Sequence, residues 1–273
     1  MNIKVKKPTK KISQKVRRFR LVIEYDGTRY SGWQAQKNAR TIQGKIIEAC
    51  KKIFEENFID LQGSGRTDSG VHALEQIAHL DVITVLAPEI IRLKLNDELP
   101  PDINIIDVEK TDFNFHARHS AKYRVYLYQI SKRRTAFAKN FVWWIKDKLN
   151  FDEMKLATNT LIGMHDFVSF ADKDQFEKSS KVLIHKIELK ETYNLILIRI
   201  IGSHFLWKMV RRIVGVLVEI GRGKKSISDL EFYLMNHSDE PKKFTAPPSG
   251  LFLEKVIYDE NINLSEIEPV VFI

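Results

Sequence analysis

One stretch of this 273-residue sequence combines several glycines with a single carboxylate, as chemistry on a bound ligand would require: Gly63-Ser64-Gly65-Arg66-Thr67-Asp68-Ser69-Gly70-Val71-His72-Ala73. Glycine allows positive φ angles and a close approach of the backbone to a ligand. Arg66, two residues before Asp68, could pair with the carboxylate or contact a phosphate. An Asx-type turn in a surface loop is the alternative interpretation, and the residues alone do not separate the two.

Two common phosphate-binding loops do not fit this stretch. Gly65 and Gly70 have the spacing of a P-loop, but Val71 and His72 stand where lysine and a hydroxyl residue are needed. A dinucleotide fingerprint would place its third glycine at position 68, where the sequence has Asp68. A nucleotide-phosphate transferase is therefore not supported.

Aromatic and basic residues occur together in two further segments. The first, Tyr25 to Gln34, includes Arg29, Tyr30 and Trp33, and would form either a surface that grips nucleic acid or a hydrophobic plug under a neighbouring domain. The second, residues 114–126, interleaves basic and aromatic residues, a pattern that suits RNA, where bases stack on aromatic rings and phosphates meet Arg or Lys. An ordinary exposed strand face is the alternative. His116 and His119 lack a third metal ligand at suitable spacing.

The segment 202–220 predicts a helix that is mostly buried. Its apolar residues follow helical spacing, but Arg211 and Arg212 interrupt them. A buried cation without a partner is costly, so we expect a carboxylate from elsewhere in the fold to pair with one of these arginines.

The charge of the chain is concentrated at its beginning. Residues 1–20 contain nine basic residues and no acid, while the remainder contains 35 Lys and Arg against 35 Asp and Glu. We expect residues 1–18 to form a flexible basic arm that strengthens binding to a polyanion. A secretory signal is not expected, since the arm has no apolar core, and an organellar transit peptide is a less favoured alternative.

The sequence contains one cysteine, Cys50, which we expect to lie in the core. A single cysteine cannot form an internal disulfide, which suits a protein of the reducing cytoplasm. No apolar run is long enough to span a membrane.

Periodicity predicts strands and helices in two successive groups. Strands are expected over 20–26, 76–83, 102–110, 123–130, 181–191, 195–201 and 251–258, and helices from Thr41, from Pro88 to the prolines at 100 and 101, and over 151–163 and 204–220. This order favours an α+β fold of two domains, 19–107 and 108–273. The first group resembles a split βαβ unit.

Six motifs taken together resemble the TruA family of tRNA pseudouridine synthases, in the family's order. They are Tyr25-Asp26-Gly27 through Gly32-Trp33-Gln34, Gly65-Arg66-Thr67-Asp68-x-Gly70-Val71-His72-Ala73, Phe115-His116-Ala117-Arg118, Gly163-x-His165-Asp166-Phe167, Phe205-Leu206-x-x-Met209-Val210-Arg211, and Ala246-Pro247 through Gly250-Leu251. Residues 1 to about 18 lie outside the resemblance.

The resemblance implies two domains with mainly antiparallel sheets, flanked by helices around an RNA-binding cleft. It further implies a homodimer that needs no metal or organic cofactor and converts uridine to pseudouridine at tRNA positions 38, 39 and 40, in the anticodon arm. A catalytically silent RNA-binding module is the alternative function.

Site residues also follow from the resemblance. Asp68 matches the catalytic aspartate, as nucleophile or as base, and Arg211 would pair with it. Tyr126 matches a tyrosine that stacks on the target uracil, and Leu251 a residue on the other side of that pocket. Arg66 would fill the space left by the flipped uridine. The residues expected to contact RNA are Arg29, Tyr30, Trp33, Gln34, His72, His116, Arg118, Lys122 and Arg124.

The assignment of Tyr126 depends on counting from Arg118. Strand alternation places Tyr123 on the opposite face but leaves Tyr128 on the same face as Tyr126. Tyr128 therefore stays open as the alternative.

Overall fold

A single mixed β-sheet extends through the body of the protein. The computed structural model describes residues 15–172 and 179–273. Within these ranges the strands are β1 (Val16–Tyr25), β2 (Phe58–Gly63), β3 (His72–Ile83), β4 (Ile103–Thr111), β5 (Tyr123–Ser131), β6 (Trp143–Trp144), β7 (Gly163–Asp166), β8 (Lys181–Glu191), β9 (Leu195–Gly202) and β10 (Leu251–Ile257). The helices are α1 (Ile42–Phe54), α2 (Pro88–Glu98), α3 (Phe151–Leu161), α4 (Met209–Gly221), α5 (Ile227–Met235) and α6 (Glu240–Lys243).

The order of the strands brings the two ends of the chain together. The sheet runs β4-β1-β3-β10-β5-β9-β8-β7, with β2 added beside β3 and β6 beside β5. Most neighbours are antiparallel, but β10 pairs in parallel with β3, where Phe252 lies opposite His72 and Leu253 opposite Ala73. The other edge of β10 pairs antiparallel with β5. The last strand therefore joins the two halves of the sheet.

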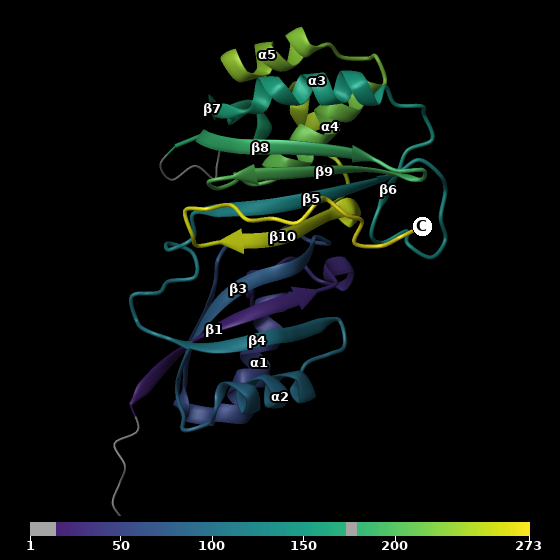
Figure 1. Ribbon diagram of the computed structural model, residues 1–273. Coiled ribbons are helices and arrows are strands. Elements are labelled where there is room, and N and C mark those ends of the chain that lie inside the picture. Colours follow the sequence, from purple (N-terminus) through teal and green to yellow (C-terminus); the bar gives the residue numbers. More distant parts are fainter. Residues whose placement is uncertain (1–14, 173–178) are drawn as a thin grey trace, which may run out of the picture.

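Each half of the sheet has its own helices and its own core. Figure 1 shows α1 and α2 beside β1, β3 and β4, and α3 and α4 beside β8 and β9, with α5 beyond α3. One cluster of buried side chains includes Leu21 and Ile46 in the first half, and another includes Ile198 and Ile213 in the second. The predicted α+β class with mainly antiparallel strands and flanking helices is confirmed. The sheet itself is continuous, a feature that the sequence patterns did not indicate.

Several local expectations are confirmed by the backbone. Thr41 caps α1, because its side chain accepts a hydrogen bond from the Gly44 amide. Pro88 begins α2. The strands expected over 181–191 and 195–201 are present as β8 and β9, with three residues between them. These element boundaries depend only on residues that are neighbours in the sequence. They can therefore be predicted without knowledge of the tertiary fold.

Other boundaries were wrong. The helix expected from residue 204 begins at Met209, because Lys208 adopts a left-handed backbone conformation with φ of 62°. The proposed basic arm reaches too far, since Val16–Arg18 belong to β1 and Arg18 forms an ion pair with Asp81 at 2.7 Å; residues 1–14 lie outside the described part. The boundary predicted after residue 107 falls inside β4, which continues to Thr111.

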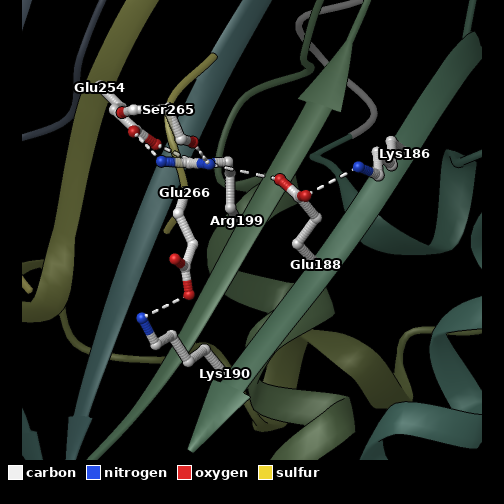
Figure 2. Close-up of polar contacts among 7 residues, drawn as sticks. All are labelled: Lys186, Glu188, Lys190, Arg199, Glu254, Ser265 and Glu266. Atoms are coloured by element: carbon white, nitrogen blue, oxygen red, sulfur yellow. Dashed lines mark hydrogen bonds and ion pairs between the residues drawn. The ribbon is translucent and has the colours of Figure 1, made fainter. Parts of the chain in front are cut away.

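The C-terminal segment covers one face of the sheet in the second half. Arg199 of β9 is 2% exposed, and its guanidinium donates to both carboxylate oxygens of Glu254, to Glu188 and to the Ser265 carbonyl. Figure 2 shows this network, which links three strands to the segment after β10. Buried arginines in this protein therefore fasten chain segments together.

None of the described helices has the length and apolar character that a bilayer span requires.

Candidate active site

Two loops of the first half pack against each other and fix the segment that carries Asp68. One is the loop between β2 and β3, and the other follows β1. The Trp33 amide donates to the Thr67 carbonyl at 3.1 Å, and the Gly70 amide to the Tyr30 carbonyl at 3.2 Å. Gly32 has φ of +87°, and a Cβ there would lie 2.6 Å from the Thr67 carbonyl oxygen. The close approach of the two loops therefore requires glycine at position 32.

The start of the Asp68 loop is also fixed. The Ser64 hydroxyl donates to the Gln76 side chain at 2.6 Å, and Gln76 donates in turn to the Gly65 carbonyl at 3.2 Å. The hydroxyls of Thr67 and Tyr25 are hydrogen-bonded at 2.8 Å. Burial raises the pKa of Tyr25, so its phenol stays neutral. Hydrogen bonds therefore fix the loop both before and after Asp68. An Asx-type turn on the surface, the alternative interpretation of this stretch, does not describe such a loop.

Asp68 meets Arg211 across the boundary between the halves. Nη1 of Arg211 lies 3.0 Å from Oδ2 of Asp68, and the two side chains are 14% and 17% exposed. Nε of Arg211 donates to the Ala246 carbonyl at 2.7 Å, which orients the guanidinium. The predicted pairing of a helix arginine with a distant carboxylate is thus confirmed. Arg212, the next residue, is buried and pairs with Asp172 instead.

Tyr126 of β5 is half-buried and close enough to Asp68 for the carboxylate to influence its phenol. Its ring meets Phe205 edge to face, with 5.1 Å between ring centroids. Burial raises the pKa of the Tyr126 phenol, and the nearby Tyr25 and Asp68 add to the rise. The phenol is therefore neutral near pH 7 and can present a flat, partly exposed ring to a planar base.

Tyr128 does not share these properties. It is fully buried, and its hydroxyl donates to the Pro247 carbonyl at 2.7 Å. A side chain without exposed surface cannot stack on a substrate, which favours Tyr126 over the alternative. Leu251 lies opposite Tyr128 in the sheet and is 4% exposed, so it belongs to the core directly behind this region.

The segment 246–250 contacts Arg211, Tyr128 and the loop that carries Asp68. Ala246 accepts from Arg211 and Pro247 from Tyr128. A Cβ at Gly70 would lie 3.0 Å from the Pro248 side chain, so this segment also contacts the Asp68 loop. The arrangement is a carboxylate paired with a guanidinium, beside a neutral aromatic ring, at the junction of two halves. It can supply a nucleophile or a base to a flat substrate.

Comparison with known proteins identifies the family of this chain. A family model described as tRNA pseudouridine synthase matches residues 21–120 and 157–259. The chain belongs to this family. The resemblance read from the six motifs is thereby confirmed, and with it membership in a family of isomerases.

Individual members of the tRNA pseudouridine synthase family match over most of the chain. The tRNA pseudouridine synthase A of Thermoanaerobacter sp. (strain X514) is 40% identical over 247 residues, which cover 89% of this chain and 100% of that protein. The enzyme of the same name from Rhodopseudomonas palustris (strain BisA53) is 42% identical over 245 residues, covering 89% and 99%. The match to a solved archaeal box H/ACA sRNP Nop10-Cbf5 complex covers 85% of this chain and 60% of the matched chain, with 10% sequence identity and a TM-score of 0.36.

The side chains predicted to contact RNA divide into two groups in this synthase. Arg29, Arg118 and Lys122 are exposed, while Gln34 and His116 are partly exposed. Arg66 is exposed as well, and its Nε donates to the Gln34 side chain at 3.1 Å. These residues remain available to a large ligand.

The remaining predicted contacts need correction, because the side chains are engaged inside the protein. Trp33 is 1% exposed and packs against Gly63, and Tyr30 is 3% exposed with its hydroxyl donating to Asp102. His72 is 1% exposed, since its ring stacks on Phe252. The hydrophobic plug is therefore the better interpretation of Tyr30 and Trp33. Arg124 donates to four backbone carbonyls of the protein.

Sequence reasoning missed three contributors to the site. Gln76 anchors the Asp68 loop, and a buried amide within an apolar strand was the available signal. Ala246 acts through its carbonyl, which no side-chain pattern reveals. Phe205 was named only as part of a family motif, yet its ring contacts Tyr126.

Proposed function

We propose that this protein isomerises uridine to pseudouridine in the anticodon arm of tRNA, at positions 38, 39 and 40, with Asp68 as the catalytic carboxylate. The observation that carries the proposal is the ion pair between Asp68 and Arg211 beside the half-buried ring of Tyr126. The family match and the names of the relatives support the reaction class.

The reaction requires three changes at one nucleotide. The bond between C1′ and N1 breaks, the base turns, and a bond forms between C1′ and C5. The proton on C5 is then lost and N1 gains one, so no atom is added overall. Asp68 would act as the nucleophile or the base, Arg211 would hold its carboxylate in position, and the Tyr126 ring would stack on the base during its rotation.

The target base must leave its stack before it can react. Arg66 is exposed and adjacent to Gln34, which suits a side chain that fills the space left by the base. Arg29, Arg118 and Lys122 would contact tRNA phosphates, and Leu251 would form the apolar wall behind the base.

Release of tritium from tRNA labelled at uridine C5 tests this function. Purified protein is incubated with the labelled tRNA, without added nucleotide, beside the Asp68→Asn variant. We expect release by the native protein, and a decrease by about 10³-fold or more in the variant with tRNA affinity nearly unchanged. Binding of tRNA without release by either protein would instead favour the silent RNA-binding module.

We also infer a homodimer in the cytoplasm. The resemblance to the family supports the dimer, and the single buried Cys50, which has no partner cysteine in this sequence, suits a reducing compartment. Light scattering during size-exclusion chromatography would measure the mass, and a monomer at micromolar concentration would contradict the dimer.

A further inference from the structure

Arg124 of β5 has an unusual set of partners for a partly buried cation. Its Nη1 donates to the carbonyls of Ala121 at 3.1 Å and Ser203 at 2.9 Å. Its Nη2 donates to the carbonyls of Ser64 at 3.2 Å and Arg118 at 2.8 Å. Within residues 15–172 and 179–273, no carboxylate forms an ion pair with it. The guanidinium is thus held entirely by peptide groups.

These four carbonyls come from three separate parts of the chain. Ser64 begins the loop that carries Asp68, and Ser203 follows β9 in the second half. Arg118 and Ala121 belong to the segment between β4 and β5. The segment between β4 and β5 packs on the core of the first half, where Ala117 is buried and Ala121 is partly buried. The side chain therefore joins two segments of the first half to the segment after β9 in the second half, across the same boundary that the active site spans.

A planar guanidinium is the side chain suited to this role. Its two terminal nitrogens carry four N–H groups that point in fixed directions in one plane, and each finds a carbonyl here. A lysine ammonium is a compact charge with three donors and cannot reach all four positions. Burial lowers the pKa of Arg124, because water is removed from around the charge. Keeping a cation here without a carboxylate has a cost, and the contacts it makes must offset that cost.

Two of the four contacts, and Arg124 itself, lie close in the chain to residues of the site. Ser64 is four residues before Asp68, and Arg124 itself is two residues before Tyr126. Ser203 is two residues before Phe205, whose ring supports Tyr126. Displacement of reacting groups by about 1 Å can lower a rate by about 10²-fold. Loss of these contacts would move Asp68 relative to Tyr126 without touching either side chain.

We propose that Arg124 is a positioning residue that fixes the Asp68 loop relative to Tyr126 and Phe205, and that it does not bind RNA. This inference rests on the proposed function, since the measured effect is on turnover. It replaces the role in RNA contact that the sequence suggested for this arginine.

The experiment compares Arg124→Lys with Arg199→Lys in the full chain. Arg199 is a matched control, because it is also a buried arginine that fastens segments of the same sheet, but its partners lie in the network of Figure 2 that includes Glu254 and Ser265. Three quantities are measured for each protein: kcat and KM by tritium release, tRNA affinity by filter binding, and hydrogen exchange of the backbone by mass spectrometry.

For Arg124→Lys we expect kcat to fall by about 10²-fold while tRNA affinity changes less than about threefold. Exchange should accelerate in segments 63–71 and 202–208 and stay unchanged in α1 and α3. Arg199→Lys should keep kcat within about twofold, although its unfolding temperature falls. Normal kcat in Arg124→Lys, or a loss of tRNA affinity equal to the loss of kcat, would overturn the proposal.

A second measurement does not depend on the stability of a variant. In the native protein, clamping by four carbonyls should slow rotation about the Cζ–Nη bonds of Arg124, and nuclear magnetic resonance should resolve separate, exchange-protected Nη protons. Averaged Nη signals would contradict the clamp. An inactive native protein would instead refute the proposed function, so the two failures are distinguishable.

Discussion

Asp68 and Arg211 are 143 residues apart in the sequence, and their side chains meet at 3.0 Å. Asp68 lies on a loop of the first half, and Arg211 lies in the first turn of α4 in the second half. The ion pair therefore forms only when the two halves of the sheet are joined through β10. This dependence explains why one continuous sheet serves a site that either half alone could not build.

Replacement of Arg211 by methionine should reduce turnover by about 10²-fold and lower the free energy of unfolding by about 1 to 3 kcal/mol, because it leaves a largely buried carboxylate without its partner. Arg222→Met is the control. Arg222 lies just after the same helix and forms ion pairs with Asp147 and Glu219. This control should lose stability but keep its turnover. Urea denaturation and tritium release measure the two effects, and equal turnover in both variants would contradict the role of Arg211.

Gly32 and Gly65 make a matched pair for testing the packing of the two loops. A Cβ at Gly32 would contact the Thr67 carbonyl oxygen at 2.6 Å in a backbone with φ of +87°, whereas a Cβ at Gly65 would have no heavy atom within 4 Å among the described residues. Gly32→Ala should lower the free energy of unfolding by about 2 kcal/mol or more, and Gly65→Ala by less than about 0.5 kcal/mol. Similar denaturation midpoints for the two variants would show that the loops do not need this close approach.

His79 should make the protein less stable in mild acid. Burial, with the nearby Arg18 and His116, lowers the pKa of His79 to about 4, and its Nδ1 accepts from the Ala117 amide. In the unfolded chain the imidazole binds a proton near its ordinary pKa of about 6.5. The unfolded state thus takes up more protons below pH 6.5, so the contribution of this residue to stability decreases as the pH falls from about 6.5 to about 4.

The measurement for this effect is the melting temperature of His79→Gln between those pH values. A glutamine can still accept from the Ala117 amide but cannot take up a proton. The decline with falling pH should therefore be shallower than in the native protein. His185→Gln, at an exposed histidine, should keep the native profile. Identical slopes for all three proteins would exclude His79 as the cause.

The parts of the fold that the sequence predicted well are those that depend on near neighbours. Thr41 caps its helix and Pro88 begins another, because both act on the backbone within one turn. The start of α4 was missed, since the left-handed conformation of Lys208 has no signature in its residue type. Strand β2 was missed because its pairing partner, β3, becomes apparent only in the folded sheet.

The candidate site shows the same division. Asp68 and Arg211 could be recognised in the sequence because each is a charged residue in an unusual context. Asp68 is the single carboxylate of a glycine-rich loop, and Arg211 is a cation in an apolar helix. The aromatic residue Trp33 stood out as well, but sequence could not tell that its ring lies buried against Gly63. The role of Arg124 was predicted wrongly for a related reason. Backbone carbonyls hold its side chain, and because every residue has a backbone carbonyl, the sequence does not show which ones accept from an arginine. Tertiary position, not residue type, decides whether a basic side chain faces RNA or the protein.

The basic residues at the start of the chain should strengthen tRNA binding through their charge. Strand β1 begins at Val16, and Arg18 bonds to Asp81 and to the Phe115 carbonyl, so a deletion that spares the fold must stop at residue 14. It removes five lysines: Lys4, Lys6, Lys7, Lys10 and Lys11. If they contact tRNA phosphates, counterion release makes their contribution large at about 50 mM salt and small at about 300 mM. The deletion should therefore weaken tRNA binding mainly at low salt. It should also reduce the slope of the logarithm of the tRNA binding constant against the logarithm of the salt concentration.

A full-length variant with glutamine at the five positions separates the effect of charge from the effect of chain length, because it should behave as the deletion does. A slope that neither change alters would refute the contribution of these lysines, while turnover at saturating tRNA should stay native in both proteins, since Asp68 and its supports remain in place.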